Sequence, residues 1–267
     1  MNGRALAESV QTITARSALL FSDVHLSETH PALTQALIQW LERHCISADH
    51  RPEQLLILGD LFDAWVGDDQ QEHPSAGAAA RAVSQTLRKI HAQGISIGFM
   101  AGNRDFLLGD AFLYPFEGRL ISDPCLLFID EGLTIAISHG DQLCTLDTNY
   151  QQFRAQVRQP EWQRDFLAQP LEKRLAIAQN IRAQSETEKS GKAMTIMDIT
   201  PEAAVALTEQ LAADKLLHGH THRPGQTTMP NGKTRWVLSD WEVDANGAVL
   251  RGGGLWVDRS GVSLRSL

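Results

Sequence analysis

Five short polar motifs, each placed directly after an apolar run, carry the side chains of this sequence that could do chemistry. In chain order they are Asp23-Val24-His25, Gly59-Asp60, Gly102-Asn103-Arg104-Asp105, His139-Gly140-Asp141 and His218-Gly219-His220-Thr221-His222. Asp, Asn and His supply the oxygen and imidazole ligands suited to divalent manganese, iron or zinc. The motifs therefore predict a metal centre.

The spacing within the motifs favours ligands that share an ion. Asp23 and His25, like His218 and His220, lie two residues apart, and residues i and i+2 of an extended backbone point to one side. Asp60 follows its own apolar run and is suited to bridging two ions. Two ions about 3.5–4 Å apart can hold a hydroxide and stabilise the attacking and leaving oxygens of an in-line displacement. The motifs thus predict a two-metal hydrolytic site.

Each residue also has an ordinary interpretation when taken alone. Asp23 and Asp60 could cap a helix or a turn, His25 could be a half-buried loop histidine, and Asn103 could be a turn residue. The joint pattern favours the binuclear site. Three histidines spaced by two need not all bind metal, so we leave His222 out of the predicted ligands. We assign the histidines outside the motifs to the surface or to structure: His30, His44, His50, His73 and His91.

The apolar runs predict strands at Ala18–Ser22, Leu55–Leu58, Ser96–Ala101, Leu126–Ile129, Leu133–Ser138, Lys215–Leu217, Arg235–Leu238 and Leu255–Val257. Amphipathic stretches at Pro31–His44 and Ala76–Gln93 predict helices, the second stopped by Gly94. This alternation is typical of a layered α/β domain, with antiparallel hairpins toward the C-terminus. Ligands of open α/β sheets bind at the carboxyl ends of the strands, where the motifs lie.

The stretch from about Asp147 to Thr200 breaks the alternation. It contains no convincing strand, and Pro170 sits where the first turn of a helix tolerates proline. We interpret the stretch as a helical cap with helices at Tyr150–Arg158, Glu161–Ala168, Pro170–Glu188 and Lys192–Ile196. The predicted organisation is a flexible tail over residues 1–17 and one domain over residues 18–267, into which the cap is inserted at about 147–200.

The composition is typical of a folded cytoplasmic protein. Of 267 residues, 43% are hydrophobic and 21% are charged, which is ordinary for a globular chain. The formal net charge of -8 argues against a protein that coats nucleic acid. The sequence contains no apolar run of about 18 residues and no signal-peptide core at its start. Three scattered cysteines fit neither a disulfide framework nor a CxxC metal site: Cys45, Cys125 and Cys144.

In its motifs the chain resembles the calcineurin-like metallophosphoesterases, whose pattern is DxH, GD, GN[HR][DE], a lone His and GHxH. The resemblance implies a four-layer α/β/β/α sandwich and two metal ions, with Asp60 shared between them. The ligands that it implies are Asp23, His25, Asp60 and His220 for one ion, and Asp60, Asn103, His139 and His218 for the other.

Longer segments resemble the branch of this family that acts in lipid A biosynthesis, and they cover most of the chain from Leu19 to about Trp241. They are GDLFDAWVGDD (59–69), GNRDFLLG (102–109), SHGDQLCTLDTNYQQFRAQVR (138–158), IRAQS (181–185), KSGKAMTIMDI (189–199) and LLHGHTHRP (216–224). The resemblance implies hydrolysis of UDP-2,3-diacylglucosamine to UMP and 2,3-diacylglucosamine 1-phosphate with Mn²⁺. We assign no function to SDWE (239–242) or to the last 25 residues.

The same resemblance implies which side chains meet the substrate. Asn103 and Arg104 match the pair that faces the diphosphate, and an arginine fork suits phosphate oxygens. Lys189 departs from the family pattern, which has asparagine there, although a lysine can still meet a phosphate. The implied substrate-binding residues are Asn103, Arg104, Asp147, Ser185, Lys189, Lys192 and His218, and the implied catalytic residues are Asp60, Asn103, Arg104 and His218.

The predicted cap concentrates positive charge in an acidic protein. Between residues 151 and 192, eight Arg and Lys face five Asp and Glu, a local net charge of +3, and apolar residues accompany them. Helical spacing alone favours helices that pack on the body with solvated charges outside. The family resemblance favours a cap that shelters acyl chains and touches an anionic membrane surface. We therefore expect a monomer bound peripherally to the cytoplasmic face of the inner membrane.

We hypothesise that a hydroxide held by the two ions attacks the α-phosphorus, while the ions and Arg104 neutralise the growing charge. Three alternatives remain. The cap and the GNRDFLLG segment argue against another phosphoesterase of this fold. The intact ligand set argues against a metal-free binding scaffold. The acidic net charge argues against a nuclease. A substrate panel and metal analysis discriminate among them.

Overall fold

The computed structural model describes residues 10–267 except 131, 192–195, 197 and 245, and residues 184–191 by their backbone alone. Two six-stranded sheets form its centre. The first has the strand order β1 (Thr12–Ala15), β6 (Cys125–Ile129), β7 (Leu133–Ser138), β8 (Lys215–His218), β10 (Thr234–Val237) and β9 (Gly225–Thr228). The second has the order β14 (Gly261–Ser266), β13 (Gly253–Asp258), β2 (Ser17–Phe21), β3 (Gln54–Leu58), β4 (Ser96–Met100) and β5 (Arg119–Ile121). A separate ribbon pairs β11 (Glu242–Val243) with β12 (Val249–Arg251).

The two sheets pack face to face because their central strands are apolar on both faces. In β3, Leu56 and Leu58 belong to the core between the sheets, where they meet Leu127 of β6. Leu55 and Ile57 of the same strand belong to a second core on the outer face. Continuous apolar runs are typical of strands that are covered on both sides, and all eight predicted strands are present with ends displaced by at most two residues.

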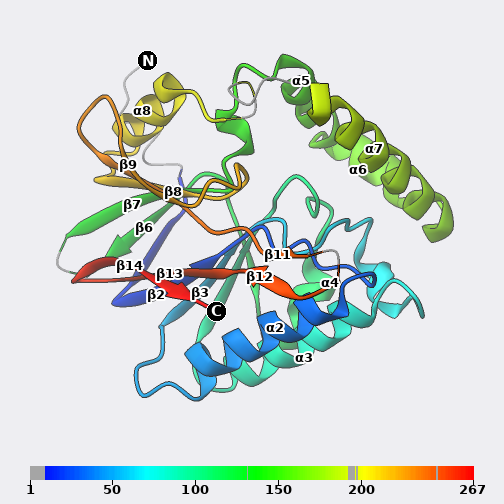
Figure 1. Ribbon diagram of the computed structural model, residues 1–267, viewed down its shortest axis with the longest axis horizontal. Helices are drawn as coiled ribbons and strands as arrows, with labels where there is room; N and C mark the ends of the chain where they lie inside the picture. The colour runs from blue at the N-terminus through cyan, green and yellow to red at the C-terminus, as the bar shows by residue number, and fades with distance from the viewer. Residues whose placement is uncertain (1–9, 131, 192–195, 197, 245) are drawn as a thin grey trace.

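Helices cover the two outer faces, so the fold is the predicted four-layer α/β/β/α sandwich. Helices α2 (Pro31–Leu41) and α3 (Ala78–His91) pack on the sheet that contains β2 and β3, and α8 (Pro201–Gln210) packs on the other sheet (Figure 1). Trp40 of α2 is fully buried in the outer core. Helix α3 ends before Gly94, whose φ of +84° lies in the left-handed region that glycine adopts readily.

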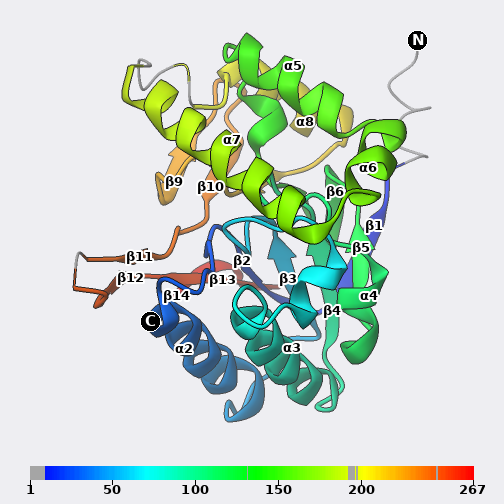
Figure 2. The ribbon, with the colours of Figure 1, turned by 90° about the vertical axis from the view of Figure 1, so that its right-hand side faces the viewer.

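Three further helices form a cap over the carboxyl ends of the strands. They are α5 (Thr148–Val157), α6 (Pro160–Leu167) and α7 (Leu171–Gly191), and Figure 2 shows them crossing above the two sheets. The three longer predicted helices are therefore present, whereas the one expected at Lys192–Ile196 falls largely outside the described residues. No helix among the described residues is long and apolar enough to cross a membrane.

The short helical segments are the π-helix η1 (Glu42–Ile46), the 3-10 helices η2 (Asp68–Glu72), η3 (Tyr114–Phe116) and η4 (Asp141–Leu143), and the single α-helical turn α4 (Asp110–Leu113). Segments η2 and α4 flank the loops that follow β3 and β4.

The predicted flexible tail over residues 1–17 is a point of difference. Residues Thr12–Ala15 form β1, which pairs in parallel with β6, and Ile13 and Ala15 are buried. Residues 1–9 lie outside the described part of the chain. The TITA segment is too short and too polar to stand out from its neighbours, and the same applies to β9, which is exposed along its whole length.

Candidate metal centre and active site

The five motifs meet at one edge of the sandwich. They follow the carboxyl ends of the parallel strands β2, β3 and β4 in one sheet and β7 and β8 in the other. Backbone hydrogen bonds join the loops: Asp23 N donates to Gly59 O (3.1 Å), and Gly219 N donates to His139 O (2.9 Å). The edge is therefore a single cross-linked platform, as expected for ligand sites in α/β sheets.

Unusual backbone conformations concentrate at this platform. Seven described non-glycine residues have positive φ, and five of them belong to the motifs. Such conformations cost on the order of 1–3 kcal/mol each and persist where the surroundings enforce them, typically at active sites. The side chains in the DxH and HxH motifs thus converge through left-handed turns rather than through the extended backbone that we expected. The five residues are Asp23, His25, Asp60, His220 and His222.

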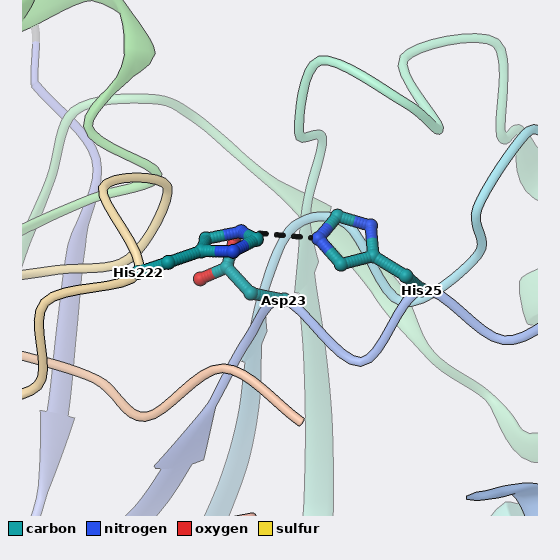
Figure 3. Close-up of side chains that lie close together, drawn as sticks. All are labelled: Asp23, His25 and His222. Atoms are coloured by element: carbon teal, nitrogen blue, oxygen red, sulfur yellow. Dashed lines mark hydrogen bonds and ion pairs between the residues drawn. The ribbon is translucent and has the colours of Figure 1, made fainter. Parts of the chain in front are cut away.

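One group of candidate ligands consists of Asp23, His25 and His222, whose side chains point toward one another (Figure 3). The Nε2 atoms of the two histidines are 3.2 Å apart, and His222 Nε2 is 3.7 Å from Asp23 Oδ1. Asp23 Oδ1 and His25 Nδ1 are buried without a hydrogen-bond partner. Buried polar atoms are costly when they lack partners, so this donor set fits a cation.

A second group of candidate ligands consists of Asp60 and His139 together with Asp23, which both groups share. His139 Nε2 is 3.6 Å from Asp60 Oδ1, while Asp60 Oδ2 is 3.9 Å from His25 Nδ1. Asn103 Oδ1 lies 3.0 Å from His139 Nε2 and 2.8 Å from His220 Nδ1. Asp60 therefore faces both groups, which is the arrangement that a bridging carboxylate requires.

His218 lies apart from both groups of described side chains, although we predicted it as a ligand. It is the last residue of β8, in register with Ser138 and Val237. Its Nε2 accepts a hydrogen bond from Arg235 Nε (2.8 Å), and its Nδ1 lies 2.8 Å from Gly219 O. Both ring nitrogens of His218 thus have hydrogen-bond partners outside the two groups. The chain leaves the strand after His218, and the next two histidines lie beside Asn103 (His220) and beside Asp23 and His25 (His222).

The electrostatics of the platform suit cations. Burial lowers the pKa of His25 well below its usual range and that of His220 to about 3, so both imidazoles are neutral, the form that binds metal. Burial would also lower the pKa of His139, but Asp60, Asp141 and Asp23 raise it to about 9. These carboxylates therefore favour a positive charge at this place. In the metal-free protein the proton on His139 supplies it, and a divalent ion would supply it instead.

Two features keep the Asp60 carboxylate in place. A Cβ on Gly102 would lie 2.2 Å from Asp60 Oδ1, so only glycine allows this approach. Asp105 is fully buried and accepts hydrogen bonds from Gly102 N (2.9 Å), Asp60 N (3.1 Å) and Leu61 N (2.7 Å). Burial, and then the nearby Asp60, raise the pKa of Asp105 to about 7. Asp105, to which we assigned no role, binds two motif loops together.

A cavity of about 490 Å³ opens from the platform toward the cap. Its walls include Asn103, Arg104, His220 and His222 of the platform. Other residues in the walls are aromatic or aliphatic. These residues are Trp65, Phe106, Phe153, Trp162, Phe166 and Ile181. The cavity thus combines candidate metal ligands with apolar walls, which suits a phosphorylated amphiphile.

A buried network connects the cap to the platform. Tyr150 and Arg154 of α5 donate to Asp141 Oδ2, from the hydroxyl (2.5 Å) and from Nε (2.8 Å). The ring of Tyr150 stacks on His220 with centroids 5.9 Å apart. Helix α5 is therefore anchored on residues that flank the candidate ligands. Sequence reasoning missed this network, because nothing in TNYQQFR marks a tyrosine as a partner of the histidine motif.

The predicted substrate-binding residues are only partly gathered by the structure. Asn103, Arg104 and Asp147 line the cavity, and Asp147 also caps α5 by accepting from Tyr150 N (3.2 Å). Ser185 and Lys189 belong to α7, but their side chains are not among those described, and Lys192 lies outside the described residues.

Comparisons with known proteins agree with this geometry. The profile of the family described as calcineurin-like phosphoesterase matches residues 17–224. A protein of Cellvibrio japonicus named UDP-2,3-diacylglucosamine hydrolase is 40% identical over 88% of this chain and 98% of its own length. A protein of Xanthomonas axonopodis pv. citri with the same name is 41% identical over 94% of this chain and 99% of its own length. The chain therefore belongs to the calcineurin-like phosphoesterase family and, within it, to the metal-dependent hydrolases that bear this name.

Proposed function

We propose that this protein hydrolyses UDP-2,3-diacylglucosamine to UMP and 2,3-diacylglucosamine 1-phosphate. The observation that carries the proposal is the cavity, because its walls combine His222 of the first ligand group, and the neighbouring Asn103 and His220, with aromatic side chains of the cap. A nucleoside diphosphate would need the candidate metal ligands, and two acyl chains would need the apolar walls. The relatives that share about 40% of the sequence are named for this substrate.

We further propose that two Mn²⁺ ions occupy the platform. The first ion would be held by Asp23, His25, Asp60 and His222, and the second by Asp60, Asn103, His139 and His220. This set replaces His218 by His222, because the ring nitrogens of His218 already have other partners. When bound, a pair of divalent ions supplies Lewis acidity toward phosphoryl oxygens and lowers the pKa of water.

The protein's own residues would orient the diphosphate. Arg104 borders the cavity beside the ligands, and its guanidinium would donate to phosphoryl oxygens, whose charge grows as the bond to the leaving group breaks. Its backbone N donates to Asp60 Oδ1 (2.8 Å) and its backbone O accepts from Trp65 N (2.9 Å), so both ends of the residue are held. Water would attack the α-phosphorus, and the sugar phosphate would leave toward the cap.

Membrane association is a separate part of the proposal. Leu146, Leu167 and Ile181 are exposed hydrophobic side chains at or near the cap, and a peripheral protein could present them to a bilayer surface. The basic residues of the cap contribute less to the binding of anionic lipid than their number suggests. Arg154 and Arg174 are paired with carboxylates of the body, which leaves fewer cations for anionic lipid. We propose a monomer that takes its substrate from the cytoplasmic face of the inner membrane.

The direct test is release of UMP from UDP-2,3-diacylglucosamine in detergent micelles by metal-stripped protein, with and without added Mn²⁺. We expect turnover only after the metal is restored. UDP-N-acetylglucosamine, which lacks the acyl chains, and bis-p-nitrophenyl phosphate serve as comparison substrates. Turnover of either comparison substrate at a kcat/KM equal to that of the lipid would reject this substrate in favour of a general phosphodiesterase. Absence of bound metal together with tight lipid binding would favour a binding scaffold.

A further inference from the structure

The ring of His222 faces acidic groups on both sides. Its Nε2 is directed at the candidate metal position, 3.7 Å from Asp23 Oδ1 and 3.2 Å from His25 Nε2 (Figure 3). Its Nδ1, on the opposite edge of the ring, lies 3.3 Å from Asp240 Oδ2. Asp240 belongs to the SDWE segment, to which the sequence assigned no function.

The position of Asp240 is set by its surroundings. Asp240 is only 5% exposed. Backbone hydrogen bonds on both sides of Asp240 join its segment to the platform. Leu238 N donates to His218 O (2.8 Å), and Trp241 N donates to Asp23 O (3.1 Å). Arg251 Nη2 donates to Asp240 Oδ2 (2.6 Å) from the ribbon strand β12. The carboxylate is thus held behind the imidazole by backbone contacts and by a cation.

We propose that Asp240 is a positioning residue that orients His222 for metal binding. Resting on the proposed two-metal function, this inference adds an acidic partner behind one ligand. Asp240 accepts a hydrogen bond from the Nδ1–H group of His222, which selects the tautomer whose Nε2 lone pair points at the ion and makes Nε2 more basic. A carboxylate behind a ligating histidine fixes the ring and tunes the ligand, and its loss typically costs about 10–100-fold in metal affinity or activity.

The geometry also supplies a matched control. Glu242 lies two residues further along the same segment and shares Arg251, with 3.2 Å between Glu242 Oε2 and Arg251 Nη2. Its side chain is 48% exposed, compared with 6% for that of Asp240, and no contact joins it to His222 among those described. Loss of the Glu242 carboxylate therefore tests the ribbon contact alone, whereas loss of the Asp240 carboxylate tests the contact with His222.

The experiment titrates metal-stripped protein with Mn²⁺ and follows free Mn²⁺ by electron paramagnetic resonance, without substrate. Wild-type protein and Glu242→Gln should bind two ions. In Asp240→Ala, one ion should bind about 10–100-fold more weakly while the other changes less than about threefold. Asp240→Asn keeps an oxygen that can accept from Nδ1 and should restore most of the affinity. His222→Ala should weaken the same ion as Asp240→Ala.

Thermal unfolding of each metal-free variant separates positioning from folding. If Asp240→Ala binds both ions as Glu242→Gln does, the positioning role is wrong while the proposed function stands. Equal weakening of both ions with a lowered melting temperature would also contradict it, because a loosened fold acts on both sites. If wild-type protein binds no Mn²⁺, the proposed function fails and the inference fails with it.

Discussion

The guanidinium of Arg174 is buried against the carboxylate of Asp69 and joins the cap to the body. Arg174 lies on α7 and is 3% exposed. Its Nη1 donates to Asp69 Oδ1 (2.9 Å) and to Val66 O (2.5 Å), its Nη2 contacts Asp69 Oδ2, and its Nε donates to Gln169 O (2.9 Å). The pair holds α7 on the loop that follows the Asp60 motif.

Arg174→Ala should therefore destabilise the protein and loosen the cavity. Hydrogen bonds to charged groups contribute about 1.5–3 kcal/mol each, and Val66 O would lose its buried donor. We expect a melting temperature lowered by several degrees and a raised KM, measured by thermal unfolding and by steady-state kinetics. The control is Arg164→Ala, whose pair with Asp165 is exposed on both sides, since such pairs contribute little. Equal effects of the two substitutions would contradict the role of Arg174 as an anchor.

Asp60→Ala removes the carboxylate that the two proposed ions share. A metal pair contributes several kcal/mol to transition-state stabilisation, and each 1.36 kcal/mol is tenfold in rate, so kcat should fall by at least about a thousandfold. Metal content, measured by elemental analysis after dialysis, should fall in parallel. Asp110→Ala, which changes an exposed carboxylate outside the platform, should leave both unchanged. Full activity of metal-stripped Asp60→Ala would end the two-metal account.

Trp162→Ala tests whether the apolar walls of the cavity bind acyl chains. Trp162 stacks on Phe166 with centroids 4.9 Å apart, and burying a large apolar side chain is worth about 1.5–3 kcal/mol. We expect KM for the diacylated substrate to rise about 10–100-fold, with a much smaller change for a short-chain analogue. Tyr114→Ala is the control, because Tyr114 is 84% exposed and does not line the cavity. An equal rise in KM for both chain lengths would place the acyl chains elsewhere.

Asp198 should make stability depend on pH. Burial would raise the pKa of its carboxyl, but hydrogen bonds from Arg235 and the charges of Arg235 and Arg223 lower it overall. A carboxyl whose pKa is lower in the folded state than in the unfolded state stabilises the fold when the pH is above its unfolded-state pKa, near 4. This stabilisation is lost as the pH falls through the folded-state pKa. Asp198→Asn should therefore melt below wild type at pH 7, and the gap should narrow below about pH 4. A gap that stays constant from pH 7 to pH 3 would exclude the titration of Asp198 as its cause.

The layers of the fold could be predicted from the sequence because the central strands are buried on both faces. Runs such as QLLIL of β3 are short and continuously apolar, which favours a strand covered on both faces. The edge strands escaped prediction because one face is open to solvent and the apolar pattern is lost, as in the exposed β9. An edge strand can thus be predicted from the sequence only where burial makes its residues apolar.

The candidate site was predictable to the level of motifs but not to the level of single histidines. Spacing placed His218, His220 and His222 on one short segment, and the choice among them depends on the residue at which β8 ends. That end is set by pairing of His218 with Ser138 and Val237 on neighbouring strands, which are far away in sequence. Asp240 and Tyr150 depend in the same way on contacts across the sheets.

Pairing of β1 with β6 has a practical consequence for the design of shortened proteins. The hydrogen-bonding edge of β6 is covered by Thr12–Ala15. A chain trimmed to begin at Ser17 would keep every side chain of the metal platform, yet it would present that edge bare to solvent. Bare edges of this kind recruit strands from other molecules, so the loss would be in solubility rather than in chemistry.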